Sequence, residues 1–271
     1  MLSGINQWAF PDDLPAVECI SRVKALGFQS FEVCVGADGP TRLDAADRDI
    51  EAIRAHAERE GIVLHSVASG EGWKNAMTSL DAEERARAIE VTKRSLDIAG
   101  LLGAKALLVV PGTVSETTPY DRAVENALDC LADLAPHAEA RKVAIAIENV
   151  WNKFLLSPTE MRDFIDQCDS PYIGAYVDVG NMLAYGYPEQ WLRILGSRVK
   201  AVHMKDFRCS VGTLGGFVML MEGDVNWPAV MAALREIDYQ GALTGEYWTY
   251  EHSRDAMLRH VKTGLDHIMA L

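Results

Sequence analysis

Four residues in the second half of the 271-residue chain have side chains of the kinds that bind metal ions: Glu148, Asp178, His203 and Glu246. Each stands at the end of a short run of β-branched and apolar residues, in the segments IENVWN, YVDVGN, VHMKDF and LTGEYW. Three carboxylates brought into one place repel one another unless a cation neutralises them. The set therefore indicates one divalent cation. Carboxylate-dominated ligands favour Mn²⁺, Mg²⁺ or Co²⁺, and Zn²⁺ is the alternative.

Each of these residues has a simpler explanation when it is taken alone. An acidic residue at the end of a strand often caps a helix or forms an ion pair, and a histidine within a strand is usually a hydrogen-bonded core residue. The four residues, however, end four predicted strands that follow one another along the chain. This order favours a shared site over four unrelated structural roles.

The elements that must position these residues alternate along the whole chain. Short apolar or β-branched runs, separated by helical patterns, lie at 3–8, 28–35, 62–68, 104–110, 143–149, 172–179, 199–205 and 242–247. No nucleotide-binding GxGxxG or GxxxxGK[ST] motif of an open sheet is present. No linker or change of composition divides the chain. We therefore predict an α/β fold with a single (β/α)8 TIM-barrel domain over residues 1–271, whose active site lies at the carboxyl ends of the strands.

The alternation of side chains along a strand predicts where the glutamates point. In the strand that ends with Glu148, Ala146 shares the face of the glutamate, whereas Ile145 and Ile147 occupy the other face. The strand before Glu246 has the same pattern. Because the bulky apolar side chains should meet the helices, we expect both carboxylates to point into the mouth of the barrel.

Several helix boundaries are marked by their capping residues. Ser157, followed by a proline and a glutamate, predicts a helix start, and Thr118 repeats the pattern. The stretch from Asp81 to Leu102 has an apolar stripe at helical spacing, and Gly103 ends it. The only long stretch without regular structure is expected from Phe207 to Asn226.

Composition and charge exclude several classes of partner. The net charge of −13 opposes binding to nucleic acid, and an AP-endonuclease-like role would need a basic groove and further ligands that the sequence does not offer. No apolar run is long enough to span a membrane, and we expect no leader peptide because the first residues lack an apolar core and a cleavage site. Five scattered cysteines without a CxxC pair indicate reduced thiols. We expect a cytoplasmic protein that binds neither nucleic acid nor membrane.

The segments IENVWN, YVDVGN, VHMKDF and LTGEYW resemble the sugar phosphate isomerase/epimerase superfamily, whose fold is the xylose isomerase-like TIM barrel. This superfamily includes the tagatose 3-epimerase and L-ribulose-5-phosphate 3-epimerase types. The resemblance covers nearly the whole chain and is strongest from Val143 to Trp248. It implies that the two glutamates and the aspartate and histidine between them hold the metal, and that Glu148 and Glu246 also serve as an acid–base pair.

The segment after the sixth predicted strand distinguishes branches of this superfamily. Asp178 is followed by Gly180 and Asn181, whereas the tagatose epimerase type has a D-x-x-H motif. The D-x-G-N form looks more like the ribulose-phosphate 3-epimerase branch. Substrate contacts of the D-x-x-H histidine therefore do not transfer to this chain.

The constellation and the resemblance together predict a metal-dependent isomerase of carbohydrate metabolism. A cation that chelates a carbonyl and the neighbouring hydroxyl would stabilise the enediolate formed when the carbon between them loses its proton. Glu148 and Glu246, on opposite sides of a ketose, would remove the C3 proton and return one to the other face, which favours a 3-epimerase. The alternatives are an aldose–ketose isomerase, a polyol dehydratase, or a sugar-binding barrel without turnover.

Further residues near the predicted site are candidates for substrate contact, each with a structural alternative: Asn6, Glu32, His65, Asn181, Lys205 and Arg208. Lys205 and Arg208 could hold sugar hydroxyls or a phosphate. The glycine-rich stretch at 211–217 is either a phosphate-binding loop or a mobile lid. The expected partner is therefore a small sugar or sugar phosphate, and a homo-oligomer is expected by analogy with other barrels.

Overall fold

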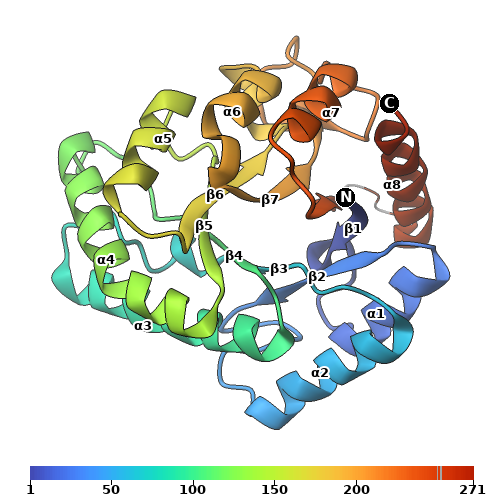
Figure 1. Cartoon of the computed structure of the whole chain (residues 1–271), viewed down its shortest axis with the longest axis horizontal. Helices are drawn as coiled ribbons and strands as arrows, with labels where there is room; N and C mark the ends of the chain where they lie inside the picture. Colours follow the sequence, from blue (N-terminus) through green and yellow to red (C-terminus); the bar gives the residue numbers. More distant parts are fainter. Residues whose placement is uncertain (249, 251) are drawn as a thin grey trace.

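The computed structural model describes residues 1–248, 250 and 252–271. Within these residues, eight parallel strands close into a barrel that eight α-helices surround (Figure 1). The barrel strands are β1 (Leu2–Asn6), β2 (Ser30–Val35), β3 (Ser66–Ser69), β4 (Ala106–Val109), β5 (Ala144–Glu148), β6 (Ile173–Asp178), β7 (Val199–Met204) and β10 (Ala242–Gly245). Their order around the barrel is β1-β10-β7-β6-β5-β4-β3-β2. This closed order confirms the TIM barrel predicted from the sequence.

One α-helix follows each barrel strand along the chain. The helices are α1 (Ala16–Ala25), α2 (Asp47–Glu60), α3 (Ala82–Leu102), α4 (Tyr120–Arg141), α5 (Pro158–Gln167), α6 (Pro188–Leu195), α7 (Trp227–Glu236) and α8 (Arg254–Met269). They form the outer ring in Figure 1, and helices that follow one another along the chain pack against each other. None of the helices in the described part of the chain is both long enough and apolar enough to cross a membrane.

Apolar side chains are divided between two regions, as the alternation along the strands predicts. Ile145 and Ile147 of β5 belong to the large core between the strands and the helices. Ala146 lies inside the barrel with Leu108 of β4 and Tyr176 of β6. Small residues such as Ala146 leave room inside the barrel for polar side chains at the strand ends.

The capping residues of α3 and α5 lie where the sequence predicts them. Asp81 caps α3 by accepting a hydrogen bond from the backbone N–H of Glu83 at 2.9 Å. Gly103 ends this helix in the left-handed conformation, with a φ of 76° that favours glycine. The hydroxyl of Ser157 caps α5 in the same way. These helices therefore begin and end through local chemistry that the sequence displays.

The start of α4 differs from its prediction. The helix begins at Tyr120, and Pro119 takes the capping position without a side-chain hydrogen bond. Thr118 does not cap the helix, because its backbone N–H and C=O both bond to Ser115 in a turn. Thr118 therefore belongs to the turn before the helix and not to the cap that the sequence pattern predicted.

The stretch from Phe207 to Asn226, which we expected to be irregular, contains a short antiparallel pair. β8 (Asp206–Phe207) pairs with β9 (Phe217–Val218), and a turn of 3-10 helix, η5 (Leu214–Gly216), precedes β9. The carboxylate of Asp206 accepts backbone N–H groups from both ends of the stretch, at Phe207, Met221, Gly223 and Val225. Strands of two residues are too short to produce a periodic pattern, which is why the sequence did not predict them. The hydrogen bonds to the buried carboxylate of Asp206 organise this segment.

Candidate active site

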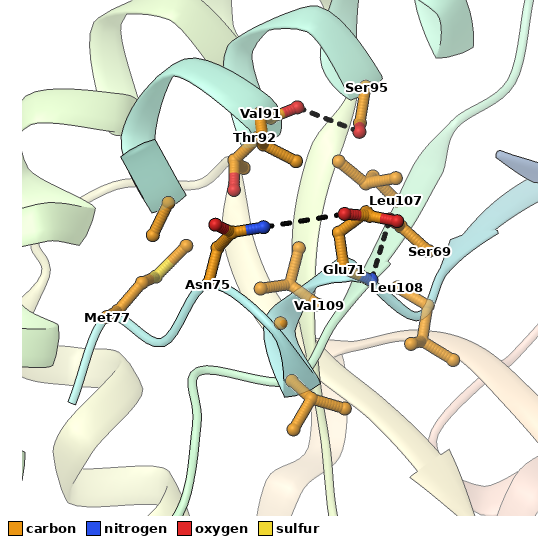
Figure 2. A pocket seen from close by; sticks show the side chains of 13 residues that line it. Ser69, Glu71, Asn75, Met77, Val91, Thr92, Ser95, Leu107, Leu108 and Val109 are labelled. Atoms are coloured by element: carbon orange, nitrogen blue, oxygen red, sulfur yellow. Dashed lines mark hydrogen bonds between the residues drawn. The ribbon is translucent and has the colours of Figure 1, made fainter. Parts of the chain in front are cut away.

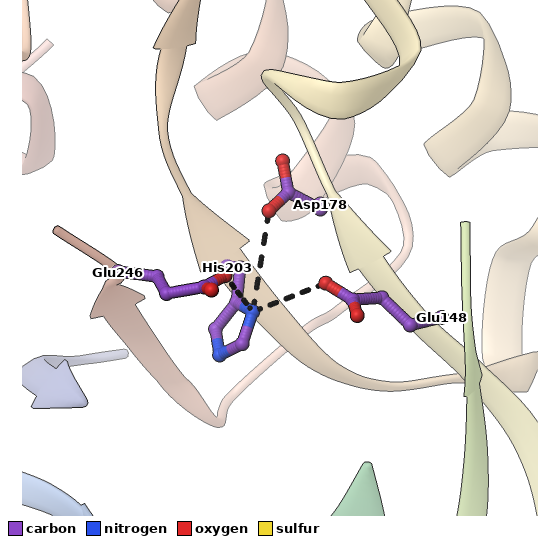
Figure 3. A group of neighbouring side chains, drawn as sticks. All are labelled: Glu148, Asp178, His203 and Glu246. Atoms are coloured by element: carbon purple, nitrogen blue, oxygen red, sulfur yellow. Dashed lines mark hydrogen bonds and ion pairs between the residues drawn. The ribbon is translucent and has the colours of Figure 1, made fainter. Parts of the chain in front are cut away.

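The four residues singled out from the sequence meet at the carboxyl ends of neighbouring strands. Glu148 ends β5, Asp178 ends β6, His203 lies in β7 and Glu246 follows β10. One candidate ligand atom from each lies within 4.8 Å of the others, and all four residues are buried. Figure 3 shows the three carboxylates pointing at the same ring nitrogen of His203, with Glu148 and Glu246 reaching it from opposite sides.

The distances at this nitrogen define the centre of the cluster. Nδ1 of His203 lies 2.9 Å from Oε2 of Glu246, 3.4 Å from Oε1 of Glu148 and 4.0 Å from Oδ2 of Asp178. Asp178 and His203 are register partners in the β6–β7 pair, so the sheet itself sets their separation. The cluster is therefore a product of strand order and register, and no long loop is needed to assemble it.

The donor set fits a divalent metal ion. Oδ2 of Asp178 and Oε2 of Glu246 are buried oxygens without a hydrogen bond of good geometry. The other oxygen of Asp178 accepts the backbone N–H groups of Gly180 and Asn181, at 2.9 and 2.8 Å, which fixes the orientation of the carboxylate. Buried carboxylate oxygens that face one imidazole nitrogen are the ligands that such ions use. These four side chains could hold one ion.

Lys205 supplies a positive charge directly beside the cluster. Its Nζ atom lies 2.9 Å from Oδ2 of Asp178 and 2.8 Å from Oε2 of Glu246. The rings of Phe217 and Trp248 cover this ammonium, with centroids 5.4 and 5.5 Å from Nζ. Burial disfavours the charged form, but the neighbouring carboxylates outweigh burial and raise the pKa of Lys205. Lys205 is therefore a charge-balancing group of the site.

The two glutamates of the cluster have different electrostatic surroundings. Burial raises the pKa of Glu148 to about 7, and the charge of Glu246 adds to this effect while His203 opposes it. Burial would also raise the pKa of Glu246, but Lys205 and His203 outweigh it and hold this pKa below its ordinary value. Two carboxyl groups in one pocket thus differ in their readiness to hold a proton.

A fourth acidic residue, Glu32 of β2, lies beneath His203. Its Oε2 atom is 2.7 Å from Nε2 of His203, so Nε2 donates to this carboxylate. With a metal ion bound, this bond would keep the proton on Nε2 and leave the lone pair of Nδ1 for the ion. Glu32 also accepts hydrogen bonds from Asn6 at 2.5 Å, from Ser66 at 2.6 Å and from Tyr176 at 2.5 Å. A carboxylate bound in this way orients the histidine as a metal ligand.

Two residues expected as substrate contacts, Asn6 and Glu32, therefore lie below the cluster and do not line the cavity above it. Asn6 is fully buried and uses its side chain to bond Glu32 and the backbone N–H of Trp8. Both residues take the structural alternative that the sequence left open.

His65 and Arg208 lie away from the cluster, so the expectation that they contact a substrate there needs correction. β3 begins only at Ser66, which places His65 at the amino-terminal end of the barrel, where Nε2 lies 3.4 Å from the backbone oxygen of Lys200. Arg208 is exposed and donates to the backbone oxygen of Glu222 at 2.9 Å. Neither side chain lines the cavity above the cluster.

Asn181 lies where the sequence places it, beside the cluster and in the wall of the cavity. Its Nδ2 atom donates to the backbone oxygen of Asn149 at 3.0 Å, and Asn149 in turn binds both backbone polar groups of Asp178. This network joins the ends of β5 and β6. Asn181 thus has a structural role, and its contact with a substrate stays a prediction.

A cavity of about 330 Å³ opens above the cluster. Glu148, Glu246 and Lys205 form part of its floor, and its wall is mostly aromatic and aliphatic: Trp8, Trp73, Trp151, Phe217, Trp248, Leu108, Val110, Val150 and Leu214. The volume is within the range of small-molecule sites. A second cavity, between β4 and α3, holds only about 20 Å³ beside Glu71 (Figure 2), which is enough for a water molecule and no more.

Residues 20–269 match the family whose description is xylose isomerase-like TIM barrel. The chain belongs to this family. The match spans nearly all of the barrel, including the strands that carry the cluster. The resemblance inferred from the four motifs is therefore confirmed.

Proteins that resemble the chain have low sequence identity to it but match over most of their length. The SgbU protein of Escherichia coli (strain K12) is 25% identical over 266 residues, covering 96% of this chain and 92% of SgbU. L-ribulose-5-phosphate 3-epimerase UlaE of Salmonella paratyphi C is 24% identical over 243 residues, covering 87% of this chain and 84% of UlaE. The crystal structure of D-psicose 3-epimerase from Clostridium cellulolyticum H10 with D-tagatose superposes with a TM-score of 0.84 at 18% identity, covering 100% and 99% of the two chains.

Three parts of the site were missed by sequence reasoning. Tyr176 and Ser66 bind Glu32, but each looks like an ordinary strand residue. Trp8 lies in a 3-10 turn after β1 and enters the cavity wall, with no motif to mark it. The charge-balancing role of Lys205 had a visible signal, because it stands two residues after His203 and so shares its face of the chain.

Proposed function

We propose that this member of the xylose isomerase-like family is a divalent-metal-dependent ketose 3-epimerase. The observation that carries the proposal is the placement of Glu148 and Glu246 on opposite sides of one metal-binding centre at the floor of a sugar-sized cavity. An epimerisation at a carbon next to a carbonyl needs one group on each face of that carbon. The names of relatives such as UlaE, a ketose-phosphate 3-epimerase, support the same reaction class.

Glu148, Asp178, His203 and Glu246 would hold the cation. When bound, the cation acts as a Lewis acid that polarises the ketose carbonyl and stabilises negative charge on its oxygen. Three carboxylates and one imidazole favour Mn²⁺, Mg²⁺ or Co²⁺, although one solved structure with the same fold is titled as a protein binding a zinc atom. The identity of the ion is part of the proposal and is open to direct metal analysis.

The protein residues then carry the proton. One glutamate takes the proton from C3, and the glutamate on the other face delivers a proton to the same carbon, which inverts its configuration. Lys205 keeps Glu246 ionised when no substrate is bound. The backbone N–H of Asn181 binds the Asp178 carboxylate and so fixes its orientation within the cluster. The aromatic wall excludes water from the reacting carbon.

The test is the exchange of the C3 proton of a ketose in heavy water, followed by NMR with and without added divalent metal. We expect metal-dependent deuterium at C3 together with the C3 epimer. Glu148→Gln and Glu246→Gln should each lose turnover by about 10²-fold or more and weaken metal binding, because each removes an acid–base group and a ligand. Glu116→Gln, an exposed substitution of the same kind, is the matched control.

Other outcomes would contradict the proposal in recognisable ways. Exchange at C1 and C2 with an aldose product would indicate an aldose–ketose isomerase. Net loss of water from the sugar would indicate a dehydratase. If the protein binds a ketose but catalyses no exchange of its protons in the presence of any divalent metal, it is a sugar-binding barrel.

A further inference from the structure

We infer that the cavity selects a ketose without a phosphate group. This inference rests on the proposed function, since it assigns the substrate class of the same site. It concerns the part of the cavity above the metal cluster, where the end of the sugar remote from the carbonyl would lie.

The wall of the cavity offers apolar surface. Trp73, Trp151 and Trp248 line it, and Leu214 and Phe217 add to it from the segment that contains η5 and β9. Trp73, Trp248 and Leu214 remain 53%, 50% and 73% exposed, so the rim presents large apolar side chains to solvent. Rings of this kind suit the carbon face of a neutral sugar.

The only cationic side chain that lines the cavity, among the described residues, is Lys205. Its ammonium is already paired with Asp178 and Glu246 and covered by the rings of Phe217 and Trp248. In this structure, turning Lys205 toward a phosphate would take its ammonium away from two buried carboxylates, which is unfavourable. With a metal ion bound, the ion would neutralise these carboxylates, and one ammonium beneath the rings of Phe217 and Trp248 would be all that the lining offers a phosphate.

The glycine-rich segment at 211–217 contributes apolar side chains to the cavity wall. Residues 211–217 contribute Leu214 and Phe217 to the cavity, and the backbone N–H of Gly216 bonds to the oxygen of Thr213 at 2.8 Å. Arg208, the arginine nearest to this segment in the sequence, donates to the backbone oxygen of Glu222 and not into the cavity. The side chains that this loop presents to the cavity are therefore apolar, whereas phosphate sites commonly use charged side chains as donors.

Charge opposes a phosphate ester as well. A phosphate monoester carries between one and two negative charges at neutral pH. Glu148 and Glu246 already lie in the cavity floor, and the whole chain has a net charge of −13. A dianion placed against tryptophan rings would lose part of its hydration without gaining a cationic side chain in return, which disfavours its binding.

The experiment compares one sugar in two forms, L-ribulose and L-ribulose 5-phosphate, with the Mn²⁺-loaded protein. Binding is followed by tryptophan fluorescence, and C3 exchange is measured on the same samples. We expect L-ribulose or a free ketohexose to bind at least about tenfold more tightly than the phosphate ester, equivalent to about 1.4 kcal/mol. Equal or tighter binding of the ester, or no binding of any free ketose, would overturn the inference.

A charge variant strengthens the test. Leu214→Arg places a cation at the exposed rim, and Leu214→Gln is the matched control without charge. We expect the arginine variant, and not the glutamine variant, to gain at least about tenfold in affinity for the phosphate ester. If the two variants bind the phosphate ester with equal affinity, the absence of a cation is not the reason that the cavity disfavours the ester.

The two proposals fail separately. Binding of free ketose without C3 exchange would contradict the 3-epimerase and leave the selectivity intact. Faster exchange with L-ribulose 5-phosphate would contradict the selectivity and support the 3-epimerase.

Discussion

At the scale of single residues, His203 is held from both sides of its ring. Nδ1 faces the three carboxylates of the cluster, and Nε2 bonds to Glu32. This second bond joins residues 171 positions apart, from strands on different sides of the barrel. The sequence motifs could identify His203 as a candidate ligand. They could not show which residue bonds to its Nε2 atom, because a local motif contains no information about contacts across the barrel.

Replacing Glu32 by glutamine should weaken metal binding without removing a ligand. The amide retains the shape of the side chain but loses the charge that polarises His203, and loss of such a partner typically costs about 10–100-fold in metal affinity. Calorimetric titration with Mn²⁺ measures this directly, without reference to activity. Tyr176→Phe removes a hydrogen bond to Glu32 only, so its effect should be smaller. Unchanged Mn²⁺ affinity in Glu32→Gln would show that this bond does not tune the histidine.

At the scale of elements, the cluster depends on strands whose pairing sets their ends at one level. The run expected at 62–68 is the instructive error. Val63 makes only an isolated bridge to Ser30, and β3 begins at Ser66. Apolar residues continue across this boundary, so hydrophobicity alone could not locate it, and His65, which was expected within the strand, precedes it. By contrast, β5 and β6 end at Glu148 and Asp178, within one residue of the predicted runs at 143–149 and 172–179.

The segment from Phe207 to Asn226 should lose its order when Asp206 is replaced by alanine. The carboxylate binds backbone N–H groups along the segment and the indole of Trp227, so its removal leaves several buried donors unpaired. We expect a loss of about 2–3 kcal/mol or more in the free energy of unfolding, and faster proteolysis within the segment. Urea unfolding and mass spectrometry of the fragments measure the two effects. A cleavage pattern identical to that of the unmodified protein would show that Asp206 does not organise the segment.

At the scale of the whole molecule, the barrel concentrates buried charge at one end of an otherwise apolar interior. Tyr176, Leu108 and small residues fill the inside of the barrel, and the charged residues lie above and among them. Eight alternating runs were enough to predict this architecture, because each βα unit must bury its strand. The charge balance could not be predicted, because it depends on which side chains meet across the barrel.

The stability of the metal-free protein should fall as the pH rises. Burial raises the pKa of Glu148 from an ordinary value of 4.5 to about 7, so the folded state favours the protonated carboxyl. The free energy of unfolding is therefore highest below the pKa of the unfolded chain and declines as the pH rises through about 7, by up to about 3 kcal/mol from this group.

Urea unfolding at a series of pH values, with and without Mn²⁺, measures this decline. Bound metal should largely abolish it, because the cation stabilises the ionised carboxylate. Glu148→Gln lacks the titrating group and should show a shallower decline in the metal-free state. A metal-free protein that becomes more stable between about pH 5 and about pH 8 would contradict the electrostatic account of the cluster.

The most direct test of the whole account is an anomalous difference map from crystals grown with Mn²⁺. We predict one strong peak bound by Nδ1 of His203 and by carboxylate oxygens of Glu148, Asp178 and Glu246. A map without a peak among these four side chains, or with a peak held by other residues, would contradict the metal centre on which the proposed chemistry depends.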